Sequence, residues 1–190
     1  YTESVSLINP LKLIHLKLED ALRDRNQTLH LEGFEGIPSI DVDPDAMGKV
    51  LRHLIINAIK YTPDGGTITV KAKMYDPAVT KHPRIPNGIE GVHITIQDTG
   101  IGIDPKYQDI IFTKFYQTGE VSLHSSGKIK FKGGGPGLGL AIASGIVKAH
   151  NGAIWVESAG HDETTLPGSC FHIVLPFHQT PEVIPAAEQG

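Results

Sequence analysis

The sequence predicts an α+β fold, an α/β sandwich in which a mixed β-sheet carries helices on one face. Two observations lead to this prediction. Helix-period and strand-period patterns of apolar residues intermix along the chain, which favours one sheet with helices packed against it. The chain of 190 residues is also long enough for one domain with a sizeable core, and its 39% hydrophobic and 20% charged residues are ordinary for a globular protein.

The first predicted element is a helix that begins at Asn9 and Pro10 and runs to about residue 25. Asparagine is a favoured N-cap, and proline is favoured at the first helical position. Apolar side chains then recur at helical spacing, at Leu11, Ile14, Leu18 and Leu22. Two short strands are predicted to follow, over residues 29–31 and 39–42.

A second helix is predicted to open at Asp43 and Pro44, which repeat the cap-and-proline signal. Its apolar stripe comprises Met47, Val50, Leu51, Leu54, Ile55, Ala58 and Ile59. Pro63 and the glycine pair at positions 65 and 66 end this helix in a turn.

Alternation of apolar and polar side chains predicts strands over residues 67–74 and 92–97. The segment 76–91 between them is rich in proline, glycine and charge, so we expect a long hairpin loop. Two further strands are predicted over residues 153–158 and 169–177.

The second half of the chain is predicted to contain a short helix after Pro105 and a longer one over residues 138–150, with Gly152 as its C-terminal stop. Residues 119–135 are polar and nearly without periodicity, and we expect them to form a long mobile lid. Proline and small polar residues from position 178 onward predict a disordered tail.

Composition excludes several partners. The chain has 17 Lys and Arg against 21 Asp and Glu, a formal net charge of −4, so it lacks an overall basic footprint for nucleic acid. No apolar run approaches the roughly 20 residues that span a bilayer, and no signal peptide opens the sequence. The lone Cys170 excludes an internal disulfide and fits a reducing compartment. We expect no nucleic-acid partner and no direct membrane contact.

Asn57 is the first candidate binding residue, because it lies in the apolar run IINAI of the second helix. Asparagine is a poor helix former and is costly to bury without partners. Its amide oxygen is a hard, neutral ligand suited to Mg²⁺, which otherwise keeps its waters and binds phosphate oxygens. An asparagine that faces water or bonds to backbone is the ordinary alternative.

His53, Lys60 and Tyr61 share the helix face of Asn57, because they lie three or four positions from it. A lysine on this face could meet a phosphate, and a tyrosine could pack on a base or ribose. A solvated lysine and an ordinary half-buried ring are the alternatives.

Asp98 ends a segment whose even-numbered positions are apolar, which predicts that its side chain lies on the buried face of the strand. A buried carboxylate must find hydrogen-bond donors. The exocyclic amine of adenine is one such donor, and the backbone of the following turn is an alternative that is at least as favourable. Gly100 and Gly102 permit positive φ and close approach of a ligand to the backbone.

Residues 133–140, GGGPGLGL, lead directly into the last predicted helix. Backbone N–H groups at a helix start attract phosphate, aided by the helix dipole. The run is neither a P-loop nor a dinucleotide fingerprint, because no Gly-Lys-Ser/Thr follows and no βαβ unit with an acidic partner surrounds it. A hinge without a ligand is the alternative. Lys114 and the lysines of the lid are candidates to reach a phosphate, although most are expected to be solvated.

These motifs, in this order, resemble the catalytic, ATP-binding domain of bacterial sensor histidine kinases, which shares a superfamily with gyrase, the heat-shock chaperone ATPases and the mismatch-repair ATPases. HLIINAIKYTP at 53–63 resembles the N box, and DTGIGI at 98–103 matches the first glycine box. FTKFY at 112–116 resembles the F box, and GGGPGLGLAIA at 133–143 matches the second glycine box. The resemblance covers roughly residues 40–177.

The resemblance implies ATP and Mg²⁺ as cofactors, bound under a lid between the F box and the second glycine box. It implies that Asn57 holds the metal, that Asp98 bonds to adenine with support from Ser169, and that Lys60 and Tyr61 line the site. The remaining nucleotide contacts expected on this basis are Gly100, Gly102, Ile103, Lys114, Gly135, Gly137, Leu138, Gly139 and Leu140.

Three departures from the family pattern matter. His53 stands where many relatives carry an asparagine and where the hydrolytic ATPases carry a catalytic glutamate, which argues against gyrase-like activation of water. A role for His53 in polarising the γ-phosphate or a bridging water is our hypothesis. Gln117 replaces an arginine that often follows the F box. No phosphoacceptor box is present, because His15 in LIHLKLED lacks the expected sequence context.

The implied organisation has three parts: a linker helix from a dimerisation domain over residues 1–28, the ATPase domain over 29–177, and a disordered tail over 178–190. The implied activity is that of a protein histidine kinase in two-component signalling. Such a kinase donates the γ-phosphoryl group of ATP to a histidine on a separate dimerisation and phosphoacceptor domain, and a response regulator is its indirect partner. A non-catalytic nucleotide-sensing module and a hydrolytic ATPase are the alternatives. The expected location is the cytoplasm, including the cytoplasmic part of a membrane-bound sensor.

Overall fold

The computed structural model describes residues 1–113 and 139–179. The predicted lid over residues 119–135 and residues 180–190 of the predicted tail therefore lie outside the described residues. The elements in chain order are β1 (Glu3–Val5), α1 (Ile8–Asp24), β2 (Thr28–Glu32), β3 (Ile40–Val42), α2 (Pro44–Tyr61), β4 (Thr67–Met74), β5 (Gly91–Asp98), the short 3₁₀ helices η1 (Pro105–Tyr107) and η2 (Ile110–Phe112), α3 (Gly139–Ala149), β6 (Ala153–Glu157) and β7 (Ser169–Pro176).

The main sheet has five strands in the order β2-β4-β5-β7-β6. β2 runs parallel to β4, whereas the other neighbouring pairs are antiparallel. The sheet is therefore mixed, as the sequence predicts. β1 and β3 form a separate two-stranded antiparallel ribbon.

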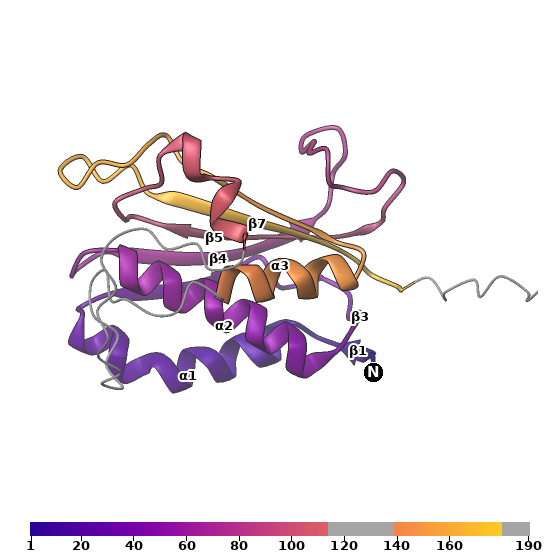
Figure 1. The fold of residues 1–190 in the computed structure, drawn as a ribbon. Coiled ribbons are helices and arrows are strands. Elements are labelled where there is room, and N and C mark those ends of the chain that lie inside the picture. Colours follow the sequence, from indigo (N-terminus) through magenta and orange to yellow (C-terminus); the bar gives the residue numbers. More distant parts are fainter. Residues whose placement is uncertain (114–138, 180–190) are drawn as a thin grey trace, which may run out of the picture.

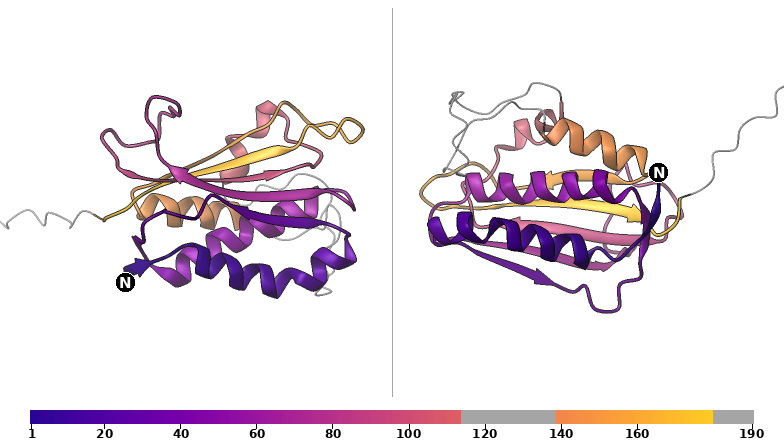
Figure 2. Two further views of the ribbon diagram at one scale, coloured as in Figure 1. Left: turned by 180° about the vertical axis from the view of Figure 1, so that it is seen from behind. Right: turned by 90° about the horizontal axis from the view of Figure 1, so that it is seen from below.

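The three helices lie against one face of this sheet, with α2 between α1 and α3 (Figures 1 and 2). The apolar stripe predicted for α2 is buried at all seven positions, and it packs with sheet residues such as Ile94, Ile96 and Phe171 in one core. The predicted α+β sandwich with helices on one face is confirmed.

Helix α1 packs in the same core, through the four apolar residues that the sequence singles out. A connection from this helix to a dimerisation domain stays a prediction, and so does the domain boundary at residue 28. Within the ranges 1–113 and 139–179, no helix combines the length and the apolar character that a membrane crossing requires.

The start of α2 is confirmed: Asp43 is its N-cap, and its side chain accepts a 3.1 Å hydrogen bond from the Ala46 backbone N–H. The N-cap predicted for α1 is wrong. That helix begins one residue before Asn9, with Leu7 at the cap position and no side-chain capping bond. Leu7 is only 4% exposed, so burial of an apolar side chain, rather than a capping hydrogen bond, accompanies the start of α1.

Gly152 takes part in the stop of α3, as predicted, although it is not the residue in the left-handed conformation. Asn151, with φ of 60°, takes the left-handed conformation expected of Gly152. Gly152 closes the turn by donating its N–H to Val147 O at 3.0 Å. A glycine is needed at 152 for another reason, because a β-carbon there would lie 2.4 Å from the Val174 backbone oxygen on β7.

The opposite face of the sheet carries a small second cluster, in which Ala153, Trp155 and Val174 are buried. Tyr75, Ile85 and Ile89 pack against it from the segment that joins β4 to β5. This connecting loop lies on the side of the sheet away from the helices (Figure 1). The long loop predicted over residues 76–91 is thus confirmed, and it covers part of the outer face.

Candidate nucleotide-binding site

Asp98 is the last residue of β5, and its side chain is buried, with 3% of the residue exposed. Oδ1 accepts hydrogen bonds from the backbone N–H groups of Gly100, at 2.9 Å, and Ser169, at 3.1 Å. Oδ2 accepts a 2.8 Å bond from Ser169 Oγ. Burial raises the pKa of the Asp98 carboxyl, while the bonds from Ser169 and Gly100 act in the opposite direction. The predicted inward orientation is confirmed, and the carboxylate does cap its own turn.

The turn after β5 is pressed against the end of α2. A β-carbon at Gly100 would lie 2.3 Å from the Tyr61 backbone oxygen, and that same oxygen accepts a 3.0 Å bond from the Ile101 N–H. Gly102 has φ of +74°, and a β-carbon there would lie 1.9 Å from Gly160 O. Both glycines are therefore required by the packing of the turn itself.

Ile103 ends the first glycine box with its backbone N–H bonded to Ser158 Oγ at 3.0 Å, and its side chain packs partly buried against the core. The Ser158 hydroxyl in turn donates to Gly168 O at 2.7 Å. The glycine turn is thus held between α2 on one side and the loop that joins β6 to β7 on the other.

The four candidate residues on α2 lie outside its fully buried stripe. Asn57, Lys60 and Tyr61 are half-buried, and His53 is exposed. Burial lowers the pKa of Lys60. Burial also lowers the pKa of His53, with smaller contributions from the positive charges of neighbouring side chains, so the neutral imidazole is favoured at neutral pH.

The start of α3 meets α2 beside His53. A β-carbon at Gly139 would lie 2.8 Å from His53 Nδ1. Leu140 is partly buried against the core. The short helix η2 is fixed to the sheet, because Phe112 packs edge-to-face on Phe171 of β7, with ring centroids 6.1 Å apart.

The structure therefore gathers the predicted residues at one end of the molecule, through two sets of contacts. One joins α2 to the Asp98 turn through Tyr61, and the other joins α2 to α3 through His53. The remaining predicted contacts, Lys114, Gly135, Gly137 and Leu138, lie outside the described residues. Nucleotide contacts and the metal role of Asn57 stay predictions.

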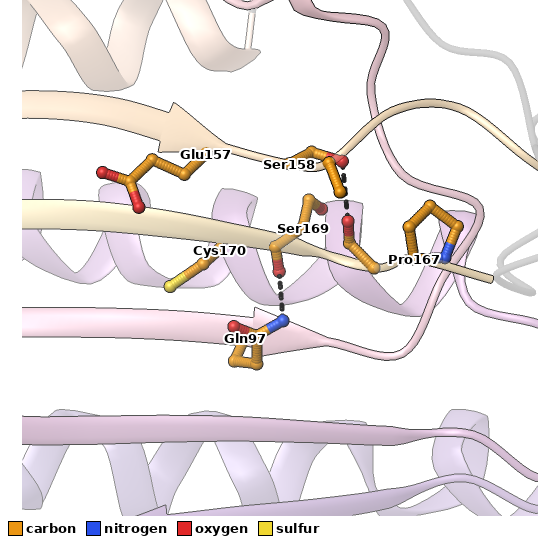
Figure 3. Close-up of a pocket in the computed structure, with 8 residues that line it drawn as sticks. Gln97, Glu157, Ser158, Pro167, Ser169 and Cys170 are labelled. Carbon is orange, nitrogen blue, oxygen red and sulfur yellow. Dashed lines mark hydrogen bonds between the residues drawn. The ribbon is translucent and has the colours of Figure 1, made fainter.

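A hollow of about 290 Å³ lies close to this site but on the outer face of the sheet (Figure 3). Gln97 and Cys170 line it, and because side chains alternate along a strand, they point away from the face that carries Asp98. Gln97 Nε2 donates to the backbone oxygen of Ser169 at 3.1 Å, as Figure 3 shows. Gln97 Nε2 also donates to the backbone oxygen of Asp98 at 3.0 Å, so the hollow contacts the Asp98 site through the backbones of both β5 and β7.

Arg25, Gln27 and Ser158 also hold the site together, and reasoning from the sequence missed them. Arg25 and Gln27 donate to backbone oxygens at the end of α2 that lie more than 30 positions away in the sequence. A charged residue just after a helix is typically solvated, so nothing local indicates this role.

Residues 42–179 match the family of histidine kinase-, DNA gyrase B-, and HSP90-like ATPases. The chain is 34% identical over 163 residues to the adaptive-response sensory kinase SasA of Synechococcus elongatus, which is 86% of this chain and 35% of SasA. It is 31% identical over 157 residues to the sensor histidine kinase WalK of Bacillus subtilis, which is 80% of this chain and 22% of WalK. The chain belongs to this ATPase family, and it spans 35% or less of the length of these two curated relatives.

Solved structures agree with this assignment. The mycobacterial sensor histidine kinase MprB aligns with a TM-score of 0.68 at 26% identity, over 95% of this chain and 100% of that chain. Histidine kinase ThkA in complex with the response regulator TrrA aligns with a TM-score of 0.67 at 22% identity, over 96% of this chain and 43% of that chain. The second likeness shows a shared fold.

Proposed function

We propose that this chain is the ATP-binding catalytic domain of a sensor histidine kinase in two-component signalling. It binds Mg-ATP and transfers the γ-phosphoryl group to a histidine on a separate dimerisation and phosphoacceptor domain. The observation that carries this proposal is the buried Asp98 carboxylate, held by Gly100 and Ser169 against the end of α2 in a member of this ATPase family.

Asp98 selects adenine in this proposal. Its Oδ1 is already engaged by two backbone donors, whereas Oδ2 accepts one bond from Ser169 and has acceptor capacity for another donor. The exocyclic amine of adenine supplies such a donor. Guanine carries a carbonyl oxygen at the equivalent ring position, which a carboxylate cannot bond. The site is therefore expected to prefer ATP over GTP.

Asn57 fits the metal, because it offers a half-buried amide oxygen on the same helix face as the cation Lys60. Mg²⁺ held there would neutralise charge on the phosphates. Lys60 adds a fixed positive charge one turn further along, and Tyr61 packs beside the base or ribose. The backbone of Gly139 and Leu140, at the positive end of the α3 dipole, is proposed to meet the phosphates together with Gly135, Gly137 and Leu138. Lys114 is proposed as a further phosphate contact.

The transfer step needs positioning and charge neutralisation more than a protein nucleophile. A nitrogen of the acceptor imidazole bonds to the γ-phosphorus while the bond from phosphorus to the bridging oxygen of ADP breaks. His53, favoured in its neutral form, is proposed to donate a hydrogen bond to the γ-phosphate or to a bridging water. Because His53 replaces the glutamate of hydrolytic relatives, water is not the preferred acceptor.

The partners follow from the same proposal. The direct partner is the dimerisation and phosphoacceptor domain of the same kinase, and a response regulator is the indirect one. The complex of ThkA with the response regulator TrrA supports this view through the shared fold. We propose a cytoplasmic location for the chain, where ATP is supplied.

The decisive test is calorimetric titration of the folded chain with Mg-ATP and with Mg-GTP, alongside the Asp98→Asn variant. Saturable ATP binding that Asp98→Asn strongly weakens supports the proposal, and absence of ATP binding to wild type overturns it. Transfer is then measured with radiolabelled ATP and isolated phosphoacceptor domains, those of SasA and WalK among them. Binding without transfer to any acceptor would favour a nucleotide-sensing module, and release of inorganic phosphate without an acceptor would favour a hydrolytic ATPase.

A further inference from the structure

We infer that Arg25 is a positioning residue for the nucleotide site, and this inference rests on the proposed function. Its guanidinium, together with the amide of Gln27, fixes the C-terminal end of α2. That end carries Lys60 and Tyr61 and supports the turn after Asp98.

Arg25 follows α1 directly and is buried, with 7% of the residue exposed. Its guanidinium donates in three directions. Nη1 donates to Ile59 O at 3.2 Å, Nη2 donates to Thr62 O at 2.6 Å, and Nε donates to Asp64 Oδ1 at 2.5 Å. One side chain thus connects the end of α1 to the last turn of α2.

Gln27, two residues further along, donates to the same two carbonyls. Its Nε2 lies 3.2 Å from Ile59 O and 2.8 Å from Thr62 O. The last four carbonyls of a helix have no partner within the helix. Because Thr62 leaves α2 in an extended conformation, with ψ of 127°, no glycine-type cap forms. Arg25 and Gln27 replace that cap with side-chain donors.

The other side of the same helix end contacts the glycine turn. The carbonyl of Tyr61, which lies between the carbonyls of Ile59 and Thr62, accepts the Ile101 N–H at 3.0 Å. Gly100, which has no room for a β-carbon against that carbonyl, donates its N–H to Asp98. A shift of the end of α2 therefore moves the turn on which the Asp98 carboxylate depends, as well as Lys60.

The geometry requires arginine in particular. A guanidinium holds its donors in a rigid planar fork that reaches several acceptors at once, whereas an ammonium is a single point on a flexible stem. The positive charge also lies at the C-terminal end of α2, where the helix dipole favours it. The side chain of Asp64 is 71% exposed, so its ion pair with Arg25 contributes little to stability. Arg25 therefore holds the end of α2 mainly through its hydrogen bonds to the two buried carbonyls, those of Ile59 and Thr62.

The test compares four variants of the full chain with wild type. Arg25→Lys keeps the charge but loses the fork, and Arg25→Met loses both. Asp64→Asn keeps an acceptor for Nε and is the matched control for the ion pair. Ile14→Ala removes a buried side chain of α1 that lies three turns from Arg25, and it controls for loss of stability alone.

Three quantities are measured: the Kd for Mg-ATP by calorimetry at a temperature where every variant is folded, the thermal unfolding midpoint, and the amide resonances of Gly100 and Ile101. Both Arg25 variants are expected to raise the Kd by about tenfold or more, which corresponds to 1.4 kcal/mol, and to shift both resonances. Asp64→Asn is expected to stay within about twofold of the wild-type Kd. Ile14→Ala is expected to lower the midpoint while leaving the Kd and the two resonances unchanged.

A wild-type Kd in Arg25→Lys, at a lowered midpoint, would make Arg25 a purely structural residue and would overturn the inference while the proposed function stands. An equal rise of the Kd in Ile14→Ala would overturn it as well. If wild type bound no Mg-ATP, the proposed function and the inference would both be lost. Should Arg25→Met fail to fold, Arg25→Lys and the two amide resonances decide the question.

Discussion

The ring of His53 on α2 lies against the backbone of Gly139 at the first residue of α3, where a β-carbon would come within 2.8 Å of Nδ1. This contact joins the helix that carries the N box to the helix that begins within the second glycine box. Any side chain at position 139 would displace the imidazole. The glycine thus has a structural role toward His53, beyond any contact with phosphate.

Substitution of Gly139 should therefore act through His53. We expect Gly139→Ala to slow phosphotransfer about as much as His53→Ala does, and the double variant to be no slower than either single one, because contacting residues are not additive. Initial rates of transfer at saturating Mg-ATP measure the coupling. Additive losses would mean that the two residues act separately. Wild-type rates in both His53→Ala and His53→Asn would remove His53 from catalysis.

Asp98→Asn should lower the affinity for ATP without lowering the stability of the fold. The asparagine oxygen can accept from the Gly100 and Ser169 N–H groups, and its NH₂ can donate to Ser169 Oγ, so the buried network stays satisfied. We expect the unfolding midpoint at pH 7 to be unchanged or higher and ATP affinity to fall by more than about tenfold. Asp98→Ala is the contrast, because it leaves two buried N–H groups unpaired and should cost about 1–3 kcal/mol of stability.

The raised pKa of Asp98 determines how its contribution to the free energy of unfolding changes with pH. Its folded-state pKa lies above the ordinary value of 3.8, so the protonated form is favoured in the folded protein. The stability that the protonated Asp98 carboxyl contributes is fully present below pH 3.8 and is lost as the pH rises through the folded-state pKa. Urea unfolding of wild type and Asp98→Asn across this range should give curves that diverge with rising pH, and parallel curves would contradict the prediction.

Asn57→Ala should abolish Mg-dependent transfer, because it removes the amide oxygen proposed to hold the metal. Asn57→Asp should do the same by adding a negative charge near the phosphates. Asn87→Ala, in the exposed loop between β4 and β5, is the control and should behave as wild type. The measurement is the transfer rate as a function of Mg²⁺ concentration. Full activity in Asn57→Ala would contradict the metal assignment.

The histidines on the outer face should make the fold sensitive to acid. His93 Nε2 and His172 Nδ1 lie 2.8 Å apart, and burial lowers the pKa of His93 from 6.5 to about 4 and also lowers the pKa of His172. Below pH 6.5 these two histidines therefore bind protons more readily in the unfolded chain than in the folded chain. The free energy of unfolding should fall as the pH drops from 6.5 toward 4, by at most about 1.4 kcal/mol per pH unit for one proton.

His93→Gln should flatten that slope, because it removes the group that titrates differently in the two states. The measurement is the free energy of unfolding in urea at several pH values between 4 and 7. Equal slopes for wild type and His93→Gln would show that other groups govern the acid sensitivity.

Much of this architecture could be predicted because its signals are local. Asp43 and Pro44 mark the start of α2, and strict alternation marks β4 at its exact bounds. The inward side chain of Asp98 follows from parity along β5, since a strand has only two faces. These patterns depend on the chain's own periodicity and do not need knowledge of a distant neighbour.

The features that could not be predicted from the sequence depend on tertiary contacts. Asn9 carries a cap signal that the structure does not use, because Leu7 is buried at the start of α1. Gly152 is needed because β7 passes close by, and Arg25 because α2 ends beside it. The contacts of Gly152 and Arg25 join parts of the chain at least 20 residues apart, and no local pattern encodes them.

The position of Trp155 has a practical consequence for spectroscopy. The chain has one tryptophan, and its ring stacks with His82, with ring centroids 4.5 Å apart, and with His172, with centroids 4.9 Å apart. It lies on the sheet face opposite the helices. Protonated imidazole quenches indole emission. We therefore expect the intrinsic fluorescence of this chain to follow acid titration of the histidines on this face, and to change little when a nucleotide binds at the proposed site on the other face.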